Sequence, residues 1–171
     1  MIFDLINLEK IRRATVYLLL LVAAFFLQNI ILARIPIYGV KAMVLPLFPC
    51  VVGFFSGGVW GALFGLLTGI FTDMNLERDA VLMTVLFPVF GFLSGALPMF
   101  FISRRVFSFF VIGLVALALT AFCQLFPYLV FYDAAPAPLF ITAGLQTALS
   151  LPFIFVFFYP IRAVSKLDLS K

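Results

Sequence analysis

The polar side chains that could perform chemistry in this chain are few, and they lie within long apolar runs. Gln28, Asn29, Gln124 and Gln146 are uncharged amides, and Asp73 is the first charged residue after a long apolar stretch. The chain has no histidine, and its two cysteines lie in separate apolar runs without metal or redox spacing. No nucleophile–base pair, carboxylate pair or metal cluster can be assembled. We therefore expect no catalytic residue, no cofactor and no metal site.

The four amides have two interpretations. Inside a membrane, side-chain amides commonly hydrogen-bond between helices, and each such contact is worth roughly 0.6 to 2 kcal/mol. The same side chains also suit a polar pocket that binds a small ligand. The sequence favours the first interpretation and leaves the second open.

Four glycines precede Asp73 at a strict spacing of four residues in the segment GGVWGALFGLLTGIFTD; they are Gly57, Gly61, Gly65 and Gly69. Small residues four apart lie near one face of a helix, where they let a neighbouring backbone approach closely. Glycine costs about 1 kcal/mol relative to alanine within a soluble helix, so its repetition indicates a contact that only glycine permits. The stripe predicts a helix-packing face or a partner interface.

Asp73 has two interpretations of its own. As a helix-end residue at the outer interface it needs no partner beyond water. As a partly buried carboxylate facing the glycine groove it requires a counter-charge, because an unpaired charge in a membrane is expensive. Arg78 and Arg34 are the candidates on the same side. The second interpretation gives Asp73 a structural role, or places it against the membrane helix of a partner.

Composition identifies the setting of these residues. Of the 171 residues, 65% are hydrophobic and only 11% are charged, with a mean hydropathy of +1.27. A soluble domain carries about 25% charged residues, so the chain is predicted to be an integral membrane protein that contacts the lipid bilayer directly. The net charge of +4 does not indicate nucleic acid, since the basic residues sit beside apolar runs, where they act as topology signals.

Length limits decide the number of helices. The charge-free run 42–72 has 31 residues, which as one helix would exceed the roughly 30 Å hydrocarbon core. Ser56-Gly57-Gly58 lies at its middle and is a turn signal, so the run is split there. We expect an all-α polytopic membrane protein, one integral domain over 1–171 with six helices in one bundle. The predicted helices cover 14–33, 38–55, 57–73, 80–102, 106–130 and 136–160.

Charge asymmetry orients this bundle. With six helices and an N-terminus in the cytoplasm, eight of the eleven basic residues fall on the cytoplasmic side. Five helices would move the Arg104-Arg105 pair to the other side and weaken this bias. The positive-inside rule therefore predicts six helices with both termini in the cytoplasm.

Several local features together resemble the MreD family of rod shape-determining proteins. The first helix ends in Leu27-Gln28 and is followed by a short loop with Ile35-Pro36. The block GALFGLLTGIFTDM, from Gly61 to Met74, looks like the family's glycine-rich helix ending in aspartate. The last helix carries a proline and ends in a basic tail, over 152–166. Length, helix count and order match across nearly the whole chain.

The resemblance implies a non-enzymatic scaffold of bacterial cell-wall elongation in the plasma membrane. Proteins of this type act with the bitopic protein MreC and link cytoplasmic MreB filaments to the wall glycosyltransferase and transpeptidase. Their fold is similar to that of the substrate-binding subunits of energy-coupling-factor vitamin transporters, which supplies the alternative function. Those subunits resemble one another in an Ala-x-x-x-Ala docking face on the first helix. The segment ATVYLLLLVAAFFLQNIILA has no such pair, which favours the scaffold.

Overall fold

The structure, a computed structural model, describes residues 2–34, 36, 39–75, 81–100, 106–131 and 136–166, and the elements within these ranges are all helices. Two helical stretches are long and apolar enough to cross a membrane, Ile11–Ile31 and Val106–Phe126. A bent pair, Ala137–Ser150 and Phe153–Ser165, is a third if it counts as one span. The predicted class, all-α with helices able to span a membrane, is confirmed at this level.

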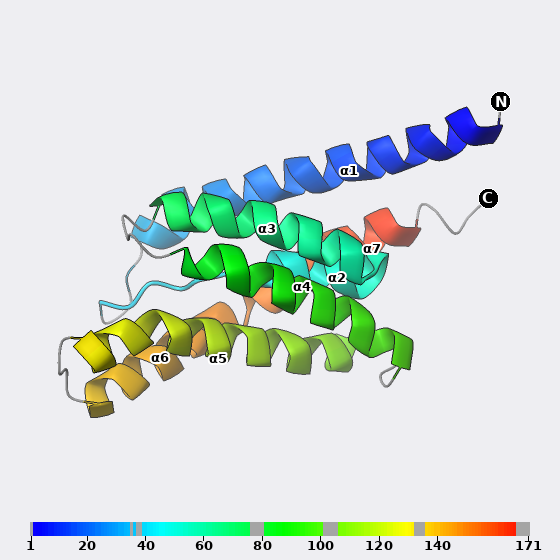
Figure 1. Ribbon diagram of the computed structural model, residues 1–171. Coiled ribbons are helices and arrows are strands. Elements are labelled where there is room, and N and C mark those ends of the chain that lie inside the picture. Colours follow the sequence, from blue (N-terminus) through cyan, green and yellow to red (C-terminus); the bar gives the residue numbers. More distant parts are fainter. Residues whose placement is uncertain are drawn as a thin grey trace.

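The described helices lie side by side in an elongated bundle (Figure 1). Most neighbours in the sequence run back and forth along its axis. A π-helical turn, η1, and a 3-10 turn, η2, end the first helix. The bounds are α1 (Ile2–Phe26), η1 (Leu27–Ile31), η2 (Leu32–Arg34), α2 (Leu47–Ser56), α3 (Gly58–Asn75), α4 (Leu82–Phe100), α5 (Val106–Phe131), α6 (Pro136–Ser150) and α7 (Phe153–Lys166).

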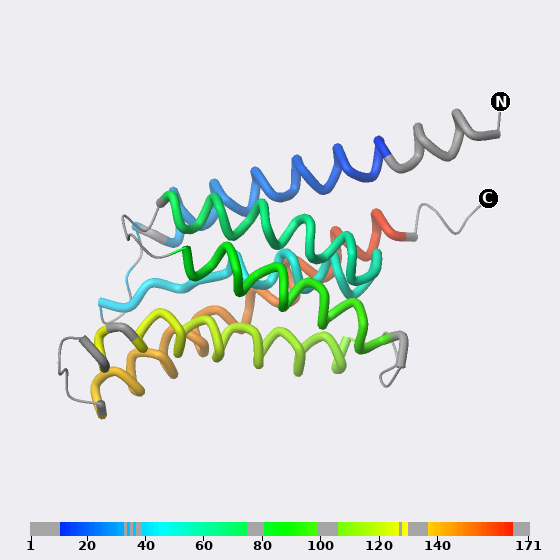
Figure 2. Tube along the Cα trace, viewed as in Figure 1, coloured from blue at the N-terminus to red at the C-terminus, as the bar shows by residue number. Residues whose placement is uncertain are grey.

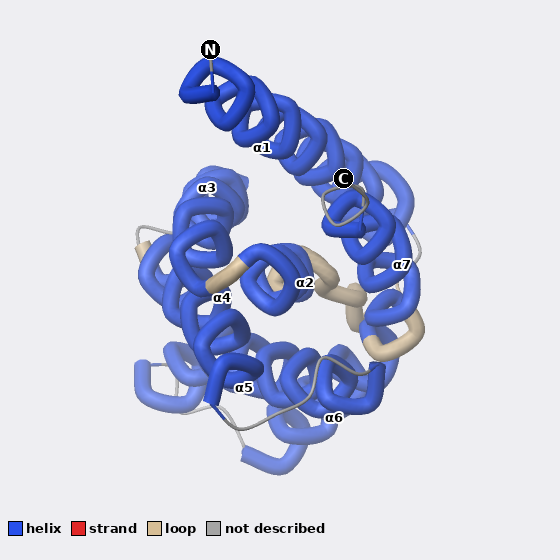
Figure 3. The backbone as a smooth tube through the Cα atoms, turned by 90° about the vertical axis from the view of Figure 1, so that its right-hand side faces the viewer, coloured by secondary structure: helices blue, strands red, loops and turns tan. Residues whose placement is uncertain are grey.

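The short helix α2 lies in the centre of the bundle, with the other helices around it (Figure 3). Every residue from Leu47 to Phe54 is buried, which suits a helix that is apolar on all sides. Phe48 of α2 lies edge-on to Phe64 of α3 and Phe157 of α7, with ring centroids 6.1 and 6.5 Å apart. The core is therefore built around α2, and the outer helices turn their remaining apolar faces outward.

The turn predicted at Ser56-Gly57-Gly58 separates α2 from α3, as expected. Gly57 ends α2 with a φ of 100°, a left-handed conformation that glycine adopts without a steric penalty. The backbone N–H of Gly57 closes the last turn on the Gly53 carbonyl at 2.8 Å. The chain then reverses, and α3 returns along the bundle beside α4.

The helix predicted over 38–55 begins only at Leu47, because Gly39–Pro46 is not helical. Proline disfavours helical conformation in the residue before it, which explains why Leu45 is not helical. Pro46 and Pro49 instead occupy the start of α2, where the missing N–H groups have no intrahelical acceptor to lose. The prolines therefore delay the helix rather than kink it.

The helix predicted over 136–160 is two helices, α6 and α7, bent by 42°. The break falls at Leu151 and Pro152, where the proline ring restricts the preceding residue. The first helix also differs, since α1 starts at Ile2 rather than residue 14 and continues into η1 and η2. The predicted bounds of the remaining helices, 57–73, 80–102 and 106–130, lie within two residues of α3, α4 and α5.

Candidate functional site

A stretch of non-helical backbone, Gly39–Pro46, runs from one end of the bundle into its interior and leads into α2 (Figure 2). Ala42, Met43, Val44 and Leu45 of this stretch are buried. Backbone N–H and C=O groups have no water to bind in the hydrocarbon region, so irregular backbone persists there only when protein groups satisfy it or a polar cavity borders it. Both conditions are met here, and they define the candidate site.

Gln28 satisfies two of these backbone groups at once. Its Nε2 donates to the Ala42 carbonyl at 2.8 Å, and its Oε1 accepts from the Val44 N–H at 2.8 Å. The two hydrogen bonds resemble a backbone hydrogen-bonded pair between two β-strands, with the side-chain amide of Gln28 in the place of one strand's backbone. Gln28 therefore holds the non-helical stretch against the end of α1.

The other two glutamines approach the same stretch from α5 and α6. Gln146 donates through Nε2 to Oε1 of Gln124 at 3.0 Å, and Gln124 donates through Nε2 to the Met43 sulfur at 2.6 Å. Ser150 Oγ accepts from the Met43 N–H at 3.0 Å and donates to the Gln146 carbonyl at 2.8 Å. The interhelical hydrogen bonds favoured by the sequence are present between α5 and α6.

A cavity of about 610 Å³ lies beside this network. All four amides predicted from the sequence border it, from the α1–η1 end, α5 and α6. Its volume lies within the roughly 300 to 1,000 Å³ typical of small-molecule sites. The two interpretations of the amides therefore coexist, since the same side chains bridge helices and line one space. The polar lining residues are Gln28, Asn29, Lys41, Thr72, Gln124, Tyr128, Thr142 and Gln146.

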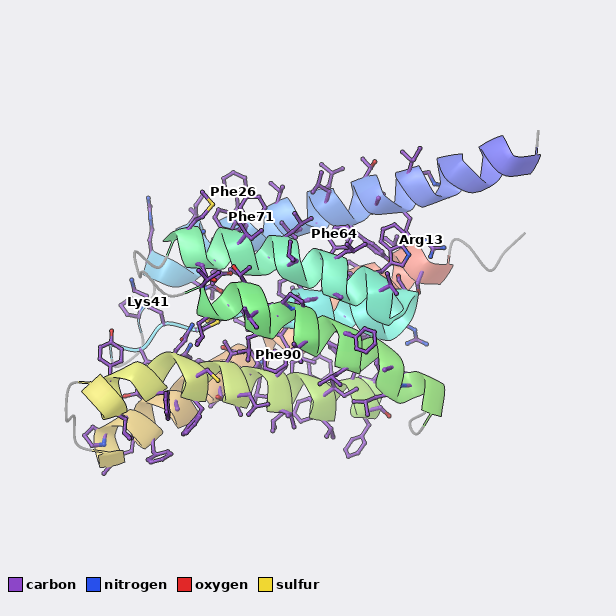
Figure 4. The ribbon with its side chains drawn as sticks, in the orientation of Figure 1. Arg13, Phe26, Lys41, Phe64, Phe71 and Phe90 are labelled. Carbon is purple, nitrogen blue, oxygen red and sulfur yellow. The ribbon has the colours of Figure 1, made fainter. Side chains whose placement is uncertain are left out.

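Lys41 gives this cavity a positive charge. It lies at the end of the bundle away from Arg13 and the end of α7 (Figure 4). Among the described residues that line the cavity, Lys41 is the charged one, and it is exposed. Sequence reasoning had grouped it with the topology signals, and no local pattern marks it as a lining residue.

The glycine stripe lies in the contact between α3 and α4, the most extensive helix pair in the described chain. A Cβ built on Gly65 would lie 2.5 Å from the Phe87 carbonyl oxygen, and one on Gly69 would lie 2.5 Å from that of Met83. Each step along α3 is matched by a step backwards along α4, so the helices are antiparallel neighbours. Of the two predicted roles, the stripe serves helix packing within the chain.

Gly57 departs from the rest of the stripe. A Cβ there would meet nothing within 4 Å, so its role is the turn described above rather than a packing contact through its own α-carbon. The packing face is extended instead by three glycines that the sequence reasoning missed. Gly91 and Gly95 of α4 and Gly53 of α2 lie against the backbones of neighbouring helices. Their spacing supplied a signal, since Gly91-x-x-x-Gly95 and Gly53-x-x-x-Gly57 repeat the same four-residue step.

Asp73 binds the start of α4. Its Oδ1 accepts from the Met83 N–H at 3.1 Å, and its Oδ2 accepts from the N–H and the hydroxyl of Thr84, each at 2.7 Å. The first N–H groups of a helix have no intrahelical partner and carry a partial positive charge. The half-buried carboxylate thus caps α4 from α3 and complements its dipole.

Two arginines, Arg34 and Arg78, were predicted as partners of Asp73, and the structure describes one of them. Arg34 is exposed and has no ion pair with Asp73 within the described chain. Arg78 lies outside the described residues. The compensation for the carboxylate therefore comes from backbone N–H groups and a hydroxyl, which the sequence reasoning did not consider.

No protein-family model, curated protein or solved structure matches this chain. Within the described ranges, no group of three histidine, cysteine, aspartate or glutamate residues could hold a metal ion. Cys50 is buried in α2, and its carbonyl accepts a hydrogen bond from Ser94 Oγ at 2.8 Å. The site is thus a cavity bordered by amides and one lysine, beside a glycine-packed helix pair.

Replacing Gln28 by leucine is expected to destabilise the protein by about 2 to 6 kcal/mol. The change leaves the buried Ala42 carbonyl and Val44 N–H without partners, and each unsatisfied group costs roughly 1 to 3 kcal/mol. Thermal unfolding of the purified protein in detergent measures the loss. Asn29→Leu is the matched control, since Asn29 is the exposed neighbour and its side chain makes no hydrogen bond within the described chain. Equal effects of the two variants would contradict the role of Gln28.

Proposed function

We propose that the protein is a non-enzymatic membrane scaffold of the bacterial cell-wall elongation machinery, of the MreD type, and that it determines rod shape. The observation that carries the proposal is the role of the block from Gly61 to Met74, on which the resemblance chiefly rests. Its glycines pack α3 against α4, and its Asp73 caps α4. The block builds a rigid helix pair, as a protein that presents a fixed surface to partners requires.

The proposed location is the bacterial plasma membrane, with six passes and both termini in the cytoplasm. In support, α1, the stretch 39–56, α3, α4, α5 and the α6–α7 pair alternate in direction along the bundle (Figure 1). The non-helical residues before α2 lengthen that short helix into a pass. Arg13, midway along α1, lies near the end of α7 (Figure 4).

Labelling of single cysteines from either side of the membrane tests this topology. The background carries alanine at Cys50 and Cys123, and one cysteine replaces Ser165 in α7 or Asn75 at the end of α3. We expect the residue-165 thiol to react only from the cytoplasm and the residue-75 thiol only from outside, as the positive-inside rule requires. Reaction of position 165 from outside, or of position 75 from the cytoplasm, contradicts the topology.

The proposed partners are an MreC-like bitopic protein and, through it, MreB filaments and the wall glycosyltransferase and transpeptidase. The apolar outer face of α1, with Leu19 and Phe26 exposed, is compatible with a neighbouring membrane helix. Affinity purification from native membranes, with cell shape as a second readout, tests the function. Recovery of an MreC-like protein and round cells on depletion would support it; rod-shaped depleted cells would overturn it.

The cavity favours one alternative function, the substrate-binding subunit of an energy-coupling-factor vitamin transporter. Such a subunit needs a ligand-sized space, and the 610 Å³ cavity supplies one. The bundle is proposed to share the fold of those subunits. Thermal stabilisation of the purified protein by a vitamin at micromolar concentration would favour this alternative, since a ligand at 100 times its Kd stabilises by about 2.7 kcal/mol.

A further inference from the structure

The cavity beside Gly39–Pro46 has a chemical character that a scaffold does not require. Lys41 supplies a positive charge, and the described lining residues include no aspartate or glutamate. Lys41 has no hydrogen-bond or ion-pair partner within the described part of the chain. A cation that faces a polar space without a counter-charge among the described residues is suited to an anion from outside.

The amides and hydroxyls around Lys41 retain hydrogen-bonding capacity. Gln146 uses one of its two Nε2–H groups on Gln124, and Asn29 uses neither within the described chain. The Thr142 hydroxyl donates to the Pro138 carbonyl at 2.8 Å, so its oxygen remains able to accept. Donors and acceptors are therefore mixed along the wall, which matches hydroxyl groups, because each hydroxyl both donates and accepts.

We propose that this cavity binds the phosphate ester of a polyol. The phosphate pairs with Lys41, since a lysine ammonium is a common phosphate ligand. The polyol hydroxyls take the free positions on Asn29 and Gln146. The volume of about 610 Å³ accommodates such a molecule with water to spare.

Other ligand classes fit the wall less well. A cationic ligand would face Lys41 without a described carboxylate to offset the repulsion. A purely apolar ligand would remove water from the amides without replacing their hydrogen bonds, which costs roughly 1 to 3 kcal/mol for each unsatisfied group. The ester has two sources, a free polyol phosphate or the headgroup of a phospholipid, and both present the same chemistry to the cavity.

This inference is independent of the scaffold proposal. A scaffold with an occupied cavity and a transporter subunit both satisfy it, and a scaffold without a ligand contradicts only the inference. A variant that no longer binds the ester and still restores rod-shaped cells would separate the two proposals. The scaffold function would be supported, and the ligand would have no role in cell shape.

Binding is measured on the full chain purified in dodecyl maltoside, which carries no phosphate. The probes are glycerol 1-phosphate for the free source and dioctanoyl-phosphatidylglycerol for the lipid source. Glycerol and dioctanoylglycerol are their uncharged counterparts. We expect one phosphate probe to bind, its uncharged counterpart to bind at least tenfold more weakly, and the identity of that probe to assign the source.

Four variants make the test specific. Lys41→Gln is expected to weaken binding about tenfold or more, because hydrogen bonds to charged groups contribute that much, and Lys41→Arg to retain it. Thr142→Phe fills the cavity without changing charge and is expected to abolish binding. Arg34→Gln removes an exposed cation that does not line the cavity and should change the affinity less than twofold.

Each contrary result overturns the proposal. Failure of both phosphate probes to bind the wild-type chain would show that the cavity does not bind a polyol phosphate ester. If Lys41→Gln and Arg34→Gln weaken the affinity for the phosphate probe equally, the binding depends on the overall surface charge and not on Lys41 in the cavity. Unchanged binding by Thr142→Phe places the ligand elsewhere.

Discussion

Leucine in place of Gly65 is expected to abolish folded protein. Even a single Cβ at this position would lie 2.5 Å from the Phe87 carbonyl oxygen and 2.7 Å from the Pro88 nitrogen. These are backbone atoms of α4, so the side chain cannot be accommodated by a rotamer change, and the helices must separate. Overpacking typically costs about 1 to 3 kcal/mol. Here the overpacking cost is increased by the loss of the other contacts between α3 and α4. The total destabilisation exceeds what a marginally stable protein tolerates.

The measurement is the yield of monodisperse protein from membranes, followed by its thermal unfolding in detergent. Gly144→Leu is the matched control, because a Cβ on Gly144 of α6 would meet nothing within 4 Å. The alanine variants sharpen the comparison: Gly65→Ala should still destabilise, whereas Gly144→Ala should be neutral or stabilising, since alanine is the better helix former. Similar unfolding temperatures for the two alanine variants would show that the stripe is not a close-packed face.

The packing of α3 could be anticipated because its signal is local. Gly61, Gly65 and Gly69 define a face by their common spacing, and the Ser56-Gly57-Gly58 turn fixes where the helix starts. The partner helix was not identified, although Gly91 and Gly95 repeat the spacing within α4. A packing face can be read from the sequence of one helix. Which helix packs against it depends on the direction in which the following loop returns the chain.

The centre of the bundle was harder to predict. A short helix was predicted over 38–55, whereas α2 begins at Leu47 and is surrounded by the other helices. The prolines carried part of the signal, since Pro46 marks a helix start. What was missing is the means of stabilising irregular backbone inside the bundle, which comes from Gln28 and Ser150.

The amides were identified by type, but their convergence was not. Gln124 lies 81 residues from Met43 in the sequence, and Ser150 lies 107 residues from it. Separations of this size leave no periodicity for a single sequence to reveal. The polarity of each side chain indicated that it needs a partner, and only the fold shows that the partners are one non-helical stretch and one cavity.

Asp73→Ala is expected to destabilise the protein by about 2 to 4 kcal/mol. The substitution removes three hydrogen bonds, from Met83 N–H, Thr84 N–H and the Thr84 hydroxyl. Hydrogen bonds to charged groups contribute roughly 1.5 to 3 kcal/mol, and loss of a helix cap costs about 0.5 to 2 kcal/mol. Asp73→Asn should have an intermediate effect, since its amide oxygen still accepts but its NH₂ group faces backbone donors.

A double-mutant cycle with Thr84→Val tests whether these losses belong to one contact. Thr84→Val removes only the hydroxyl bond at 2.7 Å and leaves both backbone N–H groups in place. Residues that share a hydrogen bond show interaction energies of about 0.5 to 3 kcal/mol in such cycles, whereas independent sites add. Additive losses for Asp73→Ala and Thr84→Val would contradict the capping role.

Cell shape then separates folding from partner binding. If the proposed shape-determining function holds and Asp73 acts by capping α4, round cells should accompany a fall in the amount of protein in the membrane, and suppressing its degradation should restore rods. Round cells that contain normal amounts of a fully stable Asp73→Ala variant would instead place the residue at the contact with an MreC-like helix. The geometry favours the first outcome, because both carboxylate oxygens already accept hydrogen bonds from the start of α4. The residue that most resembles a functional aspartate in the sequence is then the one that joins α3 to α4.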